Sequence, residues 1–308
     1  MENRILILLS TYNGEKYIEE QLLSLINQKN VEVTILIRDD GSIDSTVSII
    51  KKIQNEHDNI ILVDGVNIGC AKSFSELLLN AARMFADYNY FAFCDQDDFW
   101  LPEKLDKAVS ILNKHDQKKQ LLYCSNLWVV DKYLNNKTKK YPNNYVRIDK
   151  AMSLTESYGT GCTMVFNKAV VDFYCAHQPT ILHLHDLWIY HQCLFLGEVF
   201  YDDESYILYR QHENNVVGAK TGRFVKINSL ILTLRKIDKQ HYREVEANEI
   251  LKTYGNYLSQ KDKSNLSIVA GYRKSFIKFC KLLFSRNIKR RKNLDNLLFK
   301  LRIIFRLV

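Results

Sequence analysis

Residues 90–98 read Tyr-Phe-Ala-Phe-Cys-Asp-Gln-Asp-Asp, an apolar run that stops at three acids and an amide. A short continuous apolar run with polar residues at its end is typical of a strand buried on both faces of a parallel sheet. The stretches 5–9, 31–37 and 60–63 are also rich in Ile, Leu and Val, and polar residues follow them at 10–14, 39–42 and 67–72. We therefore predict four strands that each end in a polar cluster.

Helical patterns separate these predicted strands. Apolar side chains recur at helical spacing over 15–28 and 73–86, a third helix is expected from Asp44 or Ser45 to Gln54, and Pro102 suits the first turn of a fourth. This alternation predicts an α/β fold with a doubly wound, mostly parallel sheet and right-handed crossovers. Such sheets bind ligands at the carboxyl ends of their strands, which is where the four polar clusters fall.

The rest of the chain alternates less regularly. We expect a strand over 121–130, a polar surface excursion over 131–149, a glycine turn that leads into a strand over 159–166, helices over 169–175 and 187–196, and two short strands over 199–201 and 206–209. Residues after about 226 have a helical, amphipathic pattern. The sequence thus predicts an α/β domain over 1–225 and a helical, basic C-terminal region over 226–308.

The positive charge is concentrated in the C-terminal region. The chain carries a net charge of +8, but residues 271–308 hold twelve Lys and Arg residues against one acid, Asp295. Phe, Leu and Ile interleave with these cations, which suits attachment to an anionic membrane surface. The alternative is a helix packed on the rest of the protein with a solvated basic face. Nucleic acid is not an expected partner, because no nucleic-acid-reading motif accompanies the charge.

Composition and cysteine spacing indicate the class of protein and its compartment. Hydrophobic residues make up 46% and charged residues 25%, which is ordinary for a globular protein. The seven cysteines are scattered and form no CxxC pair, so a disulfide framework or zinc ribbon is not expected. There is no signal-peptide pattern and no apolar run of the ~18 residues that would span a bilayer. We expect a cytoplasmic protein, located at the inner face of the cell membrane if its basic region binds there.

The acids after the predicted strand over 90–94 are candidate metal ligands. Mg²⁺ and Mn²⁺ prefer oxygen ligands and are commonly shared between one or two carboxylates and substrate phosphates. Asp95 and Asp97 could hold such a cation, although a charged turn that caps the next helix would have the same composition.

Two further clusters are candidate contacts for a nucleotide. A carboxylate of Asp39 or Asp40 could accept a hydrogen bond from a base or a ribose hydroxyl, and Lys72 could meet a phosphate or a base carbonyl. A turn with a helix cap and a solvated helix start are the alternatives. The glycine patterns of dinucleotide-binding and P-loop proteins are absent, which argues against dehydrogenases and P-loop NTPases.

The C-terminal part of the predicted domain holds candidate groups for catalysis. Asp186 could act as a general base or simply cap its helix. Arg210 could pair with phosphate, and His212 could complete a metal shell or be a structural histidine. His183, His185 and His191 lack a fourth ligand at a supporting spacing, so a zinc site is not favoured.

Taken in order, these motifs resemble family 2 glycosyltransferases, most closely the bacterial rhamnosyltransferases and the capsular or O-antigen polysaccharide glycosyltransferases. The resemblance covers about residues 4–220 and rests on the motifs Ser10-Thr11-Tyr12-Asn13-Gly14, Asp39-Asp40-Gly41-Ser42-Ile43-Asp44, Asn67-x-Gly69, Asp95-Gln96-Asp97-Asp98-x-Trp100, Gly161-Cys162, His185-Asp186-x-Trp188 and Tyr209-Arg210-x-His212.

This resemblance implies a GT-A fold and inverting transfer of a sugar from a nucleotide-sugar donor to a glycan or lipid-linked acceptor. It implies dTDP-rhamnose as the favoured donor, with UDP-sugars as the alternative, and Mn²⁺ or Mg²⁺ as cofactor. It assigns Asp186 as the catalytic base. The metal ligands are Asp95, Asp97 and His212. The donor-binding residues are Ser10, Thr11, Tyr12, Asn13, Gly14, Asp39, Asp40, Asn67, Lys72, Asp95, Gln96 and Arg210. The acceptor-side residues are Trp100, Gly161, His185 and Trp188.

Two other functions are compatible with parts of the pattern. A sugar-phosphate nucleotidyltransferase also uses paired acids on a doubly wound sheet, but it normally has a glycine- and cation-rich loop after the first strand. A non-catalytic, membrane-associated module that binds nucleotide-sugars would have no need for Asp95, Asp97, Asp186 and His212.

Overall fold

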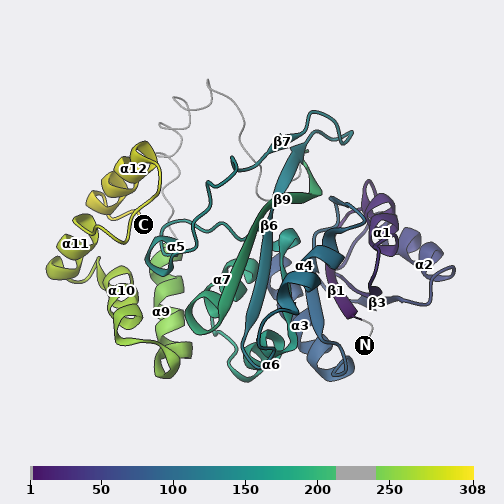
Figure 1. The fold of residues 1–308 in the computed structure, drawn as a ribbon, viewed down its shortest axis with the longest axis horizontal. Helices are drawn as coiled ribbons and strands as arrows, with labels where there is room; N and C mark the ends of the chain where they lie inside the picture. The colour runs from purple at the N-terminus through teal and green to yellow at the C-terminus, as the bar shows by residue number, and fades with distance from the viewer. Residues whose placement is uncertain (1–2, 213–240) are drawn as a thin grey trace. The chain divides into compact units, whose positions relative to one another are not determined.

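The computed structural model describes residues 3–212 and 241–308. The chain divides into two compact units (Figure 1). The first contains residues up to 147 together with 159–176 and 184–212, and the second contains 148–158, 177–183 and the described residues from 241 onward. The predicted boundary at residues 225 and 226 lies outside the described residues. That 148–158 and 177–183 belong with the C-terminal helices could not be predicted from the sequence pattern.

The first unit is built on one mixed sheet with the strand order β3-β2-β1-β4-β8-β6-β9-β5, and β7 pairs with β6. Its parallel half consists of β1 (Arg4–Thr11), β2 (Glu32–Asp39), β3 (Ile60–Asp64) and β4 (Tyr90–Cys94). The predicted α/β class with a mostly parallel sheet is confirmed. The predicted range 90–94 for the fourth strand is also correct.

The second half of the sheet mixes strand directions. β8 (Val165–Asn167) runs antiparallel to both β4 and β6 (Leu121–Val130), whereas β9 (Glu198–Arg210) runs parallel to β6. The short strands β5 (Phe99–Trp100) and β7 (Thr138–Lys139) pair antiparallel with β9 and β6.

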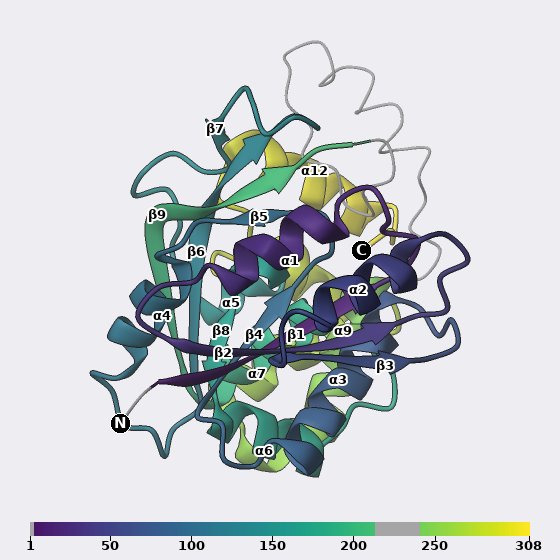
Figure 2. The ribbon, with the colours of Figure 1, turned by 90° about the vertical axis from the view of Figure 1, so that its right-hand side faces the viewer.

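Helices cover both faces of the parallel strands. Figure 2 shows α1 (Ile18–Ile26) and α2 (Thr46–Gln54) on one face and α3 (Cys70–Met84) on the other. The remaining helices of this unit are α4 (Lys104–Leu112), the 3₁₀ turn η1 (Gly161–Thr163), α6 (Lys168–Ala176) and α7 (His185–Leu196). Every residue from Ile5 to Leu9 is fully buried, as expected for a central strand between two helical layers.

Strand register brings the polar clusters to one edge. Ser10 lies opposite Arg38 and Thr11 opposite Asp39, while Leu9 lies opposite Cys94, the last residue before Asp95. Parallel strands in this register end together, so the polar residues that follow them must lie close together.

Three local predictions need correction. Residues 198–210 form one long strand rather than two short ones, because shifts in the β6–β9 register accommodate the polar stretch around Ser205. Pro102 lies in a turn before α4, which starts at Lys104. Of the two suggested caps for α2, Asp44 accepts the amide of Thr46 at 3.0 Å, whereas the Ser45 side chain makes no capping bond.

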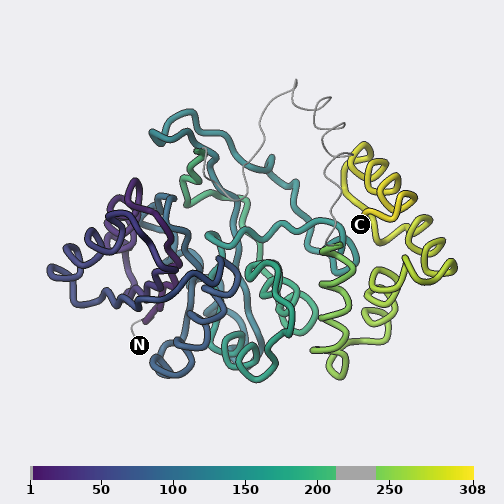
Figure 3. Tube along the Cα trace, turned by 180° about the vertical axis from the view of Figure 1, so that it is seen from behind, coloured from purple at the N-terminus to yellow at the C-terminus, as the bar shows by residue number. Residues whose placement is uncertain are grey.

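The second unit is helical, as the amphipathic pattern predicts for its described part (Figure 3). It contains α5 (Lys150–Ser153), α9 (Tyr242–Tyr254), η2 (Gly255–Tyr257), α10 (Gln260–Gly271), α11 (Phe276–Leu283) and α12 (Asn293–Ile304). The segment 148–158 is tied in by Lys150, 3.5 Å from Asp262, and by the Thr155 hydroxyl, which donates to the carbonyl of Lys289 at 2.8 Å. Among the described residues, no helix has the length and apolar character needed to cross a membrane.

Candidate active site

The loops after β1 and β4 are joined by the side chain of Gln96. Its Oε1 accepts from the Thr11 hydroxyl at 2.6 Å and from the Tyr12 amide at 2.8 Å, and its Nε2 donates to the Tyr12 carbonyl at 3.1 Å. Gly14 is needed next to it, because a Cβ there would lie 2.4 Å from Gln96 Oε1. The Tyr12 side chain stays 44% exposed, so its ring is open to a ligand at this edge.

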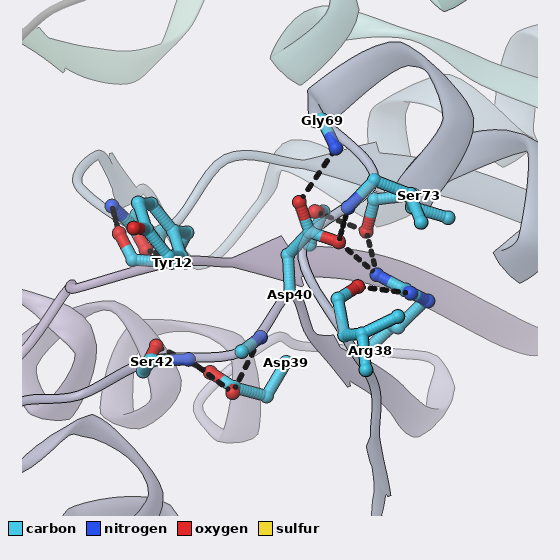
Figure 4. Close-up of polar contacts among 12 residues, drawn as sticks. Tyr12, Arg38, Asp39, Asp40, Ser42, Gly69 and Ser73 are labelled. Carbon is cyan, nitrogen blue, oxygen red and sulfur yellow. Dashed lines mark hydrogen bonds and ion pairs between the residues drawn. The ribbon is translucent and has the colours of Figure 1, made fainter.

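The side chains of Asp39 and Asp40 are both buried, and both carboxylates accept hydrogen bonds from backbone amides (Figure 4). Asp39 accepts from the amides of Gly41 at 3.0 Å and Ser42 at 2.7 Å, which shapes the turn after β2. Asp40 points the other way and accepts from the amides of Ile68 and Gly69, each at 2.9 Å. Gly69 has φ +85°, a backbone conformation that favours glycine, and this lets its amide reach Asp40.

Two residues not predicted from the sequence complete this part of the site. The guanidinium of Arg38 pairs with Asp40 and also donates to the Ser73 hydroxyl at 3.1 Å and to the Val66 carbonyl at 3.0 Å. Ser73 in turn accepts from the Ser10 hydroxyl at 2.7 Å. The result is a continuous polar chain beneath the strand ends, from Ser10 through Ser73 and Arg38 to Asp40. Arg38 was missed because it directly follows the apolar stretch 31–37 and there belongs to an ordinary polar turn pattern.

The predicted metal ligands Asp97 and His212 are brought together. His212 Nε2 lies 2.8 Å from Asp97 Oδ2, and both side chains are largely buried. Two ligands at right angles, each about 2.1 Å from an octahedral ion, lie about 3 Å apart. This carboxylate and imidazole therefore fit a shared Mg²⁺ or Mn²⁺ ion.

Asp95 sits in a crowded, negatively charged environment. Burial, followed by the charges of Asp97 and Asp186, raises the pKa of Asp95 to about 7. Burial and the charges of Asp97 and Asp95 also raise the pKa of Asp98 well above its usual range. Carboxylates collected in this way repel one another, and a bound cation would relieve that repulsion.

Buried groups that the sequence did not single out lie next to Asp95. Among the described residues, ligand atoms of Asp95, Asp98 and Cys162 lie within 4.8 Å of one another. Burial raises the pKa of the Cys162 thiol well above its usual range, which keeps it protonated and unsuited to metal binding. Nearby, Lys104 is fully buried with its Nζ 3.4 Å from the Trp100 ring centroid. We interpret these buried groups as support for the loop after β4.

The guanidinium of Arg210 is engaged by three protein groups. Its side chain is buried, and it donates from Nε to the Asp97 carbonyl at 2.9 Å, from one terminal nitrogen to the Lys132 carbonyl at 2.7 Å, and from the other to Glu20. The donor contact expected from the sequence stays a prediction.

Asp186 lies at the start of α7 and faces the turn η1. Its Oδ2 accepts from the Gly161 amide at 3.2 Å, and its Oδ1 accepts from the amide of Leu187 at 2.7 Å. A Cβ on Gly161 would lie 3.2 Å from Asp186 Cβ, so this glycine allows the close approach. Asp186 is thus held in place by backbone amides beside the acids of β4.

The predicted acceptor-side residues divide into two groups. Trp100 and Trp188 are fully buried, so the expectation that they contact an acceptor needs correction: both are core residues. His185 stacks on Phe74 with ring centroids 3.8 Å apart, and burial lowers its pKa to about 4, so the ring is neutral. Gly161 remains beside Asp186 as described. Of the donor residues, Asn67 and Lys72 are exposed near the start of α3, and Asn13 joins the turn after β2 through its amide, 2.9 Å from the Ser42 hydroxyl.

Comparison with known proteins shows which family the chain resembles. The sequence profile of Glycosyl transferase family 2 matches residues 6–174. A dTDP-rhamnosyl transferase, RfbG of Shigella flexneri, is 34% identical over 247 residues, covering 74% of this chain and 80% of the relative. An uncharacterised glycosyltransferase of Rickettsia typhi is 24% identical over 239 residues, covering 76% and 72%.

Solved structures of similar fold include two proteins in complex with a nucleotide-sugar. Staphylococcus aureus TarS 1–349 in complex with UDP-GlcNAc superposes with a TM-score of 0.59 at 16% identity, covering 99% of this chain and 82% of TarS. The mannosyltransferase PcManGT of Pyrobaculum calidifontis, in complex with GDP-Man and Mn²⁺, has a TM-score of 0.53 at 15% identity, covering 100% and 81%. At these identities the likeness shows the fold alone. The family match over more than half of the chain, together with the RfbG relative, shows that this protein belongs to glycosyl transferase family 2 and is a glycosyltransferase.

Proposed function

We propose that the protein transfers a sugar from a nucleotide-sugar donor to a glycan or lipid-linked acceptor, with inversion and with the help of a divalent cation. The observation that carries this proposal is the 2.8 Å approach of His212 to Asp97, next to Asp95 and on the edge where the strands end. The 34% identity to a dTDP-rhamnosyl transferase favours dTDP-rhamnose as the donor, with a UDP-sugar as the alternative.

The nucleoside is held at the ends of β1 and β2. The exposed ring of Tyr12 offers a stacking surface, and the loop 10–14 is kept in place by Gln96. Asp39 and Asp40 form the floor of this site through the turns that they organise. Lys72, exposed in the first turn of α3, can reach toward the diphosphate, where its positive charge would stabilise the leaving group.

Asp95, Asp97 and His212 would hold the cation. A bound Mn²⁺ or Mg²⁺ would neutralise the charge that develops on the departing diphosphate. Within the protein, His212 and Asp97 supply one nitrogen and one oxygen ligand. The raised pKa of Asp95 indicates that this carboxyl group also gains from a positive charge beside it.

Asp186 is the general base of this proposal. The amides of Gly161 and Leu187 orient its carboxylate. So oriented, the carboxylate would take the proton of an acceptor hydroxyl as the oxygen attacks the anomeric carbon. A single displacement of this kind, with the base opposite the leaving diphosphate, inverts the anomeric configuration.

The transfer reaction can be tested by measuring nucleoside diphosphate release from a panel of sugar nucleotides, with Mn²⁺, with Mg²⁺ and with chelator. Metal-dependent release from one donor would support the proposal and identify the donor. Formation of a nucleotide-sugar from a nucleoside triphosphate and a sugar phosphate would instead support a nucleotidyltransferase. Tight donor binding without turnover, even when lipid-linked glycans are supplied, would support a binding module.

For the location of the protein, we propose the cytoplasmic face of an anionic membrane, contacted by the second unit. Leu294, Leu297, Leu301 and Ile304 follow one another along one face of α12 and are 36–55% exposed. Phe276 and Ile277 on α11 are more exposed still. The surrounding cations, among them exposed Lys281, Lys289, Arg291 and Lys292, would complement anionic lipid headgroups.

Vesicle sedimentation of the full chain tests this surface. We expect binding to vesicles that contain phosphatidylglycerol but not to pure phosphatidylcholine, and at least a 10-fold loss in a Leu297→Glu, Leu301→Glu variant. Leu23→Glu on α1, which alters a similarly exposed leucine, is the matched control. Unchanged binding by the double variant would contradict the proposal. A concentration-dependent dimer that this variant abolishes would instead identify a second copy as the partner.

A further inference from the structure

Arg210 links three segments that are far apart in the sequence. Its guanidinium donates to the Asp97 carbonyl in the loop after β4, to the Lys132 carbonyl in the loop after β6, and to the Glu20 carboxylate on α1. Its exposed fraction is 2%. The ion pair with Glu20 is therefore shielded from solvent on the arginine side, which strengthens it relative to a surface pair.

The backbone of Arg210 adds a second link to the same loop. Its amide donates to Asp98 Oδ1 at 3.3 Å, while its side chain holds the carbonyl of the preceding residue, Asp97. His212 follows two residues later and meets the Asp97 carboxylate at 2.8 Å. Residues 210–212 therefore contact both the backbone carbonyl and the side-chain carboxylate of Asp97, the proposed metal ligand.

Tyr17 connects this arrangement to the donor loop. The Arg210 guanidinium carbon lies 4.5 Å from the Tyr17 ring centroid, and the His212 ring lies 4.9 Å from the same ring. Tyr17 directly precedes α1, and Glu20 belongs to the first turn of that helix. The start of α1, which follows the loop 10–14, is therefore packed against both Arg210 and His212.

From these contacts we propose that Arg210 and Glu20 are positioning residues for the divalent cation: they set the separation of Asp97 and His212 and touch neither the donor nor the ion. This inference rests on the metal site of the proposed function. Partners that orient metal ligands in this way contribute strongly to affinity, and their loss typically weakens metal binding by about 10–100-fold.

The inference differs measurably from a role in binding phosphate. If Arg210 contacted the donor diphosphate, its substitution would weaken nucleotide binding even in the absence of metal. If it positions Asp97, metal-free nucleotide affinity stays unchanged, while the affinity for Mn²⁺ falls. The KM for Mn²⁺ then rises, and kcat at saturating Mn²⁺ stays near that of the wild type.

The experiment measures Mn²⁺ binding to the full chain by electron paramagnetic resonance of free Mn²⁺, with and without dTDP or UDP, and nucleotide binding in chelator by calorimetry. We compare wild type with Arg210→Lys, which keeps the charge but cannot make three directed contacts, and with Glu20→Gln. Glu20 is half-exposed, so Glu20→Gln tests the ion pair without burying a new group. Glu19→Gln, one position away on the exposed side of α1, is the matched control.

We expect a 10–100-fold loss of Mn²⁺ affinity in Arg210→Lys, a smaller loss in Glu20→Gln and none in Glu19→Gln, with metal-free nucleotide affinity unchanged in all three. Mn²⁺ affinities equal to wild type in both Arg210→Lys and Glu20→Gln would overturn the positioning role and leave the metal site standing. A lower metal-free nucleotide affinity in Arg210→Lys would overturn it in favour of phosphate binding. Absence of Mn²⁺ binding in the wild type, with or without nucleotide, would overturn both the metal site and the positioning role.

Discussion

His212 Nε2 lies 2.8 Å from Asp97 Oδ2, although 115 positions separate the two residues in the chain. The contact exists because β9 returns alongside β6 and β5 and ends next to the loop that follows β4. An aspartate and a histidine at this distance can chelate one ion, and this pair underlies the first prediction.

Replacing Asp97 by alanine should reduce turnover by about 10²–10⁴-fold, because stabilisation of the departing diphosphate depends on the cation that Asp97 would hold. The measurement is nucleoside diphosphate release at saturating donor and Mn²⁺. Asp58→Ala, which removes an exposed acid elsewhere in the same unit, should leave the rate unchanged. Turnover equal to that of the wild type in purified Asp97→Ala would show that Asp97 is not a metal ligand.

Asp186→Asn should also reduce transfer by about 10²–10⁴-fold, but with little change in donor affinity, since the amide cannot accept the acceptor's proton. Asparagine retains one acceptor oxygen, which can keep the 2.7 Å bond from the Leu187 amide, whereas its amino group cannot accept from the Gly161 amide; urea denaturation of the variant checks that the fold persists. Transfer rates and calorimetric donor binding separate the two effects. Near-normal transfer by this variant would exclude Asp186 as the base.

Asp40→Asn should destabilise the protein by about 3–5 kcal/mol, because it leaves the buried guanidinium of Arg38 without its counter-charge. Asp39→Asn is the comparison, since its remaining oxygen can still accept from the Gly41 and Ser42 amides, and we expect it to cost about 1 kcal/mol. Urea denaturation measures both. An equal loss of unfolding free energy in the two variants would show that the Arg38–Asp40 ion pair does not contribute more than the hydrogen bonds of Asp39.

Lys104→Met should stabilise the protein at neutral pH by about 1–3 kcal/mol. Burial lowers the pKa of Lys104 from 10.5 to about 7, so between these values the unfolded chain binds a proton that the folded chain does not. The stability of the wild type should therefore rise with pH from about 7 to 10.5, and the advantage of the variant should shrink over the same range.

The check on Lys104 is urea denaturation of both proteins at pH 7 and pH 10. Lys107→Met, which alters an exposed lysine of the same helix, should change neither stability nor its pH dependence. A constant difference between Lys104→Met and wild type at the two pH values would contradict the assignment of this titration to Lys104.

Much of the fold could be predicted because its central strands are buried on both faces. The strand limits 90–94 and 121–130 agree with the structure to the residue, since each stretch is mainly apolar and stops at polar residues. The single strand 198–210 could not be predicted, because its polar middle reads as a break. Only pairing with β6, with its shifted register, shows that the strand continues.

The site divides in a similar way. Asp95, Asp97, Asp186 and His212 were proposed as site residues from residue type and motif. Arg38, Glu20 and Tyr17 were not, because Arg38 directly follows an apolar run and the other two lie within an ordinary helix pattern, so only their contacts in the structure draw attention to them. Trp100 and Trp188 show the converse: their place in the motifs suggested an acceptor contact, and their complete burial shows a role in the core.

The sequence by itself therefore determined where most of the buried strands lie along the chain, the strand ends at which the polar clusters collect, and the family. These are properties of local apolar periodicity and of motif spacing, which need no knowledge of distant contacts. Only the tertiary structure decided which polar group meets which. Ser10 donates a hydrogen bond to Ser73, which is 63 positions away in the chain, and Arg210 donates to Glu20, which is 190 positions away. Whether a charged side chain is exposed for a ligand or buried in contacts that stabilise the fold depends on such distant contacts.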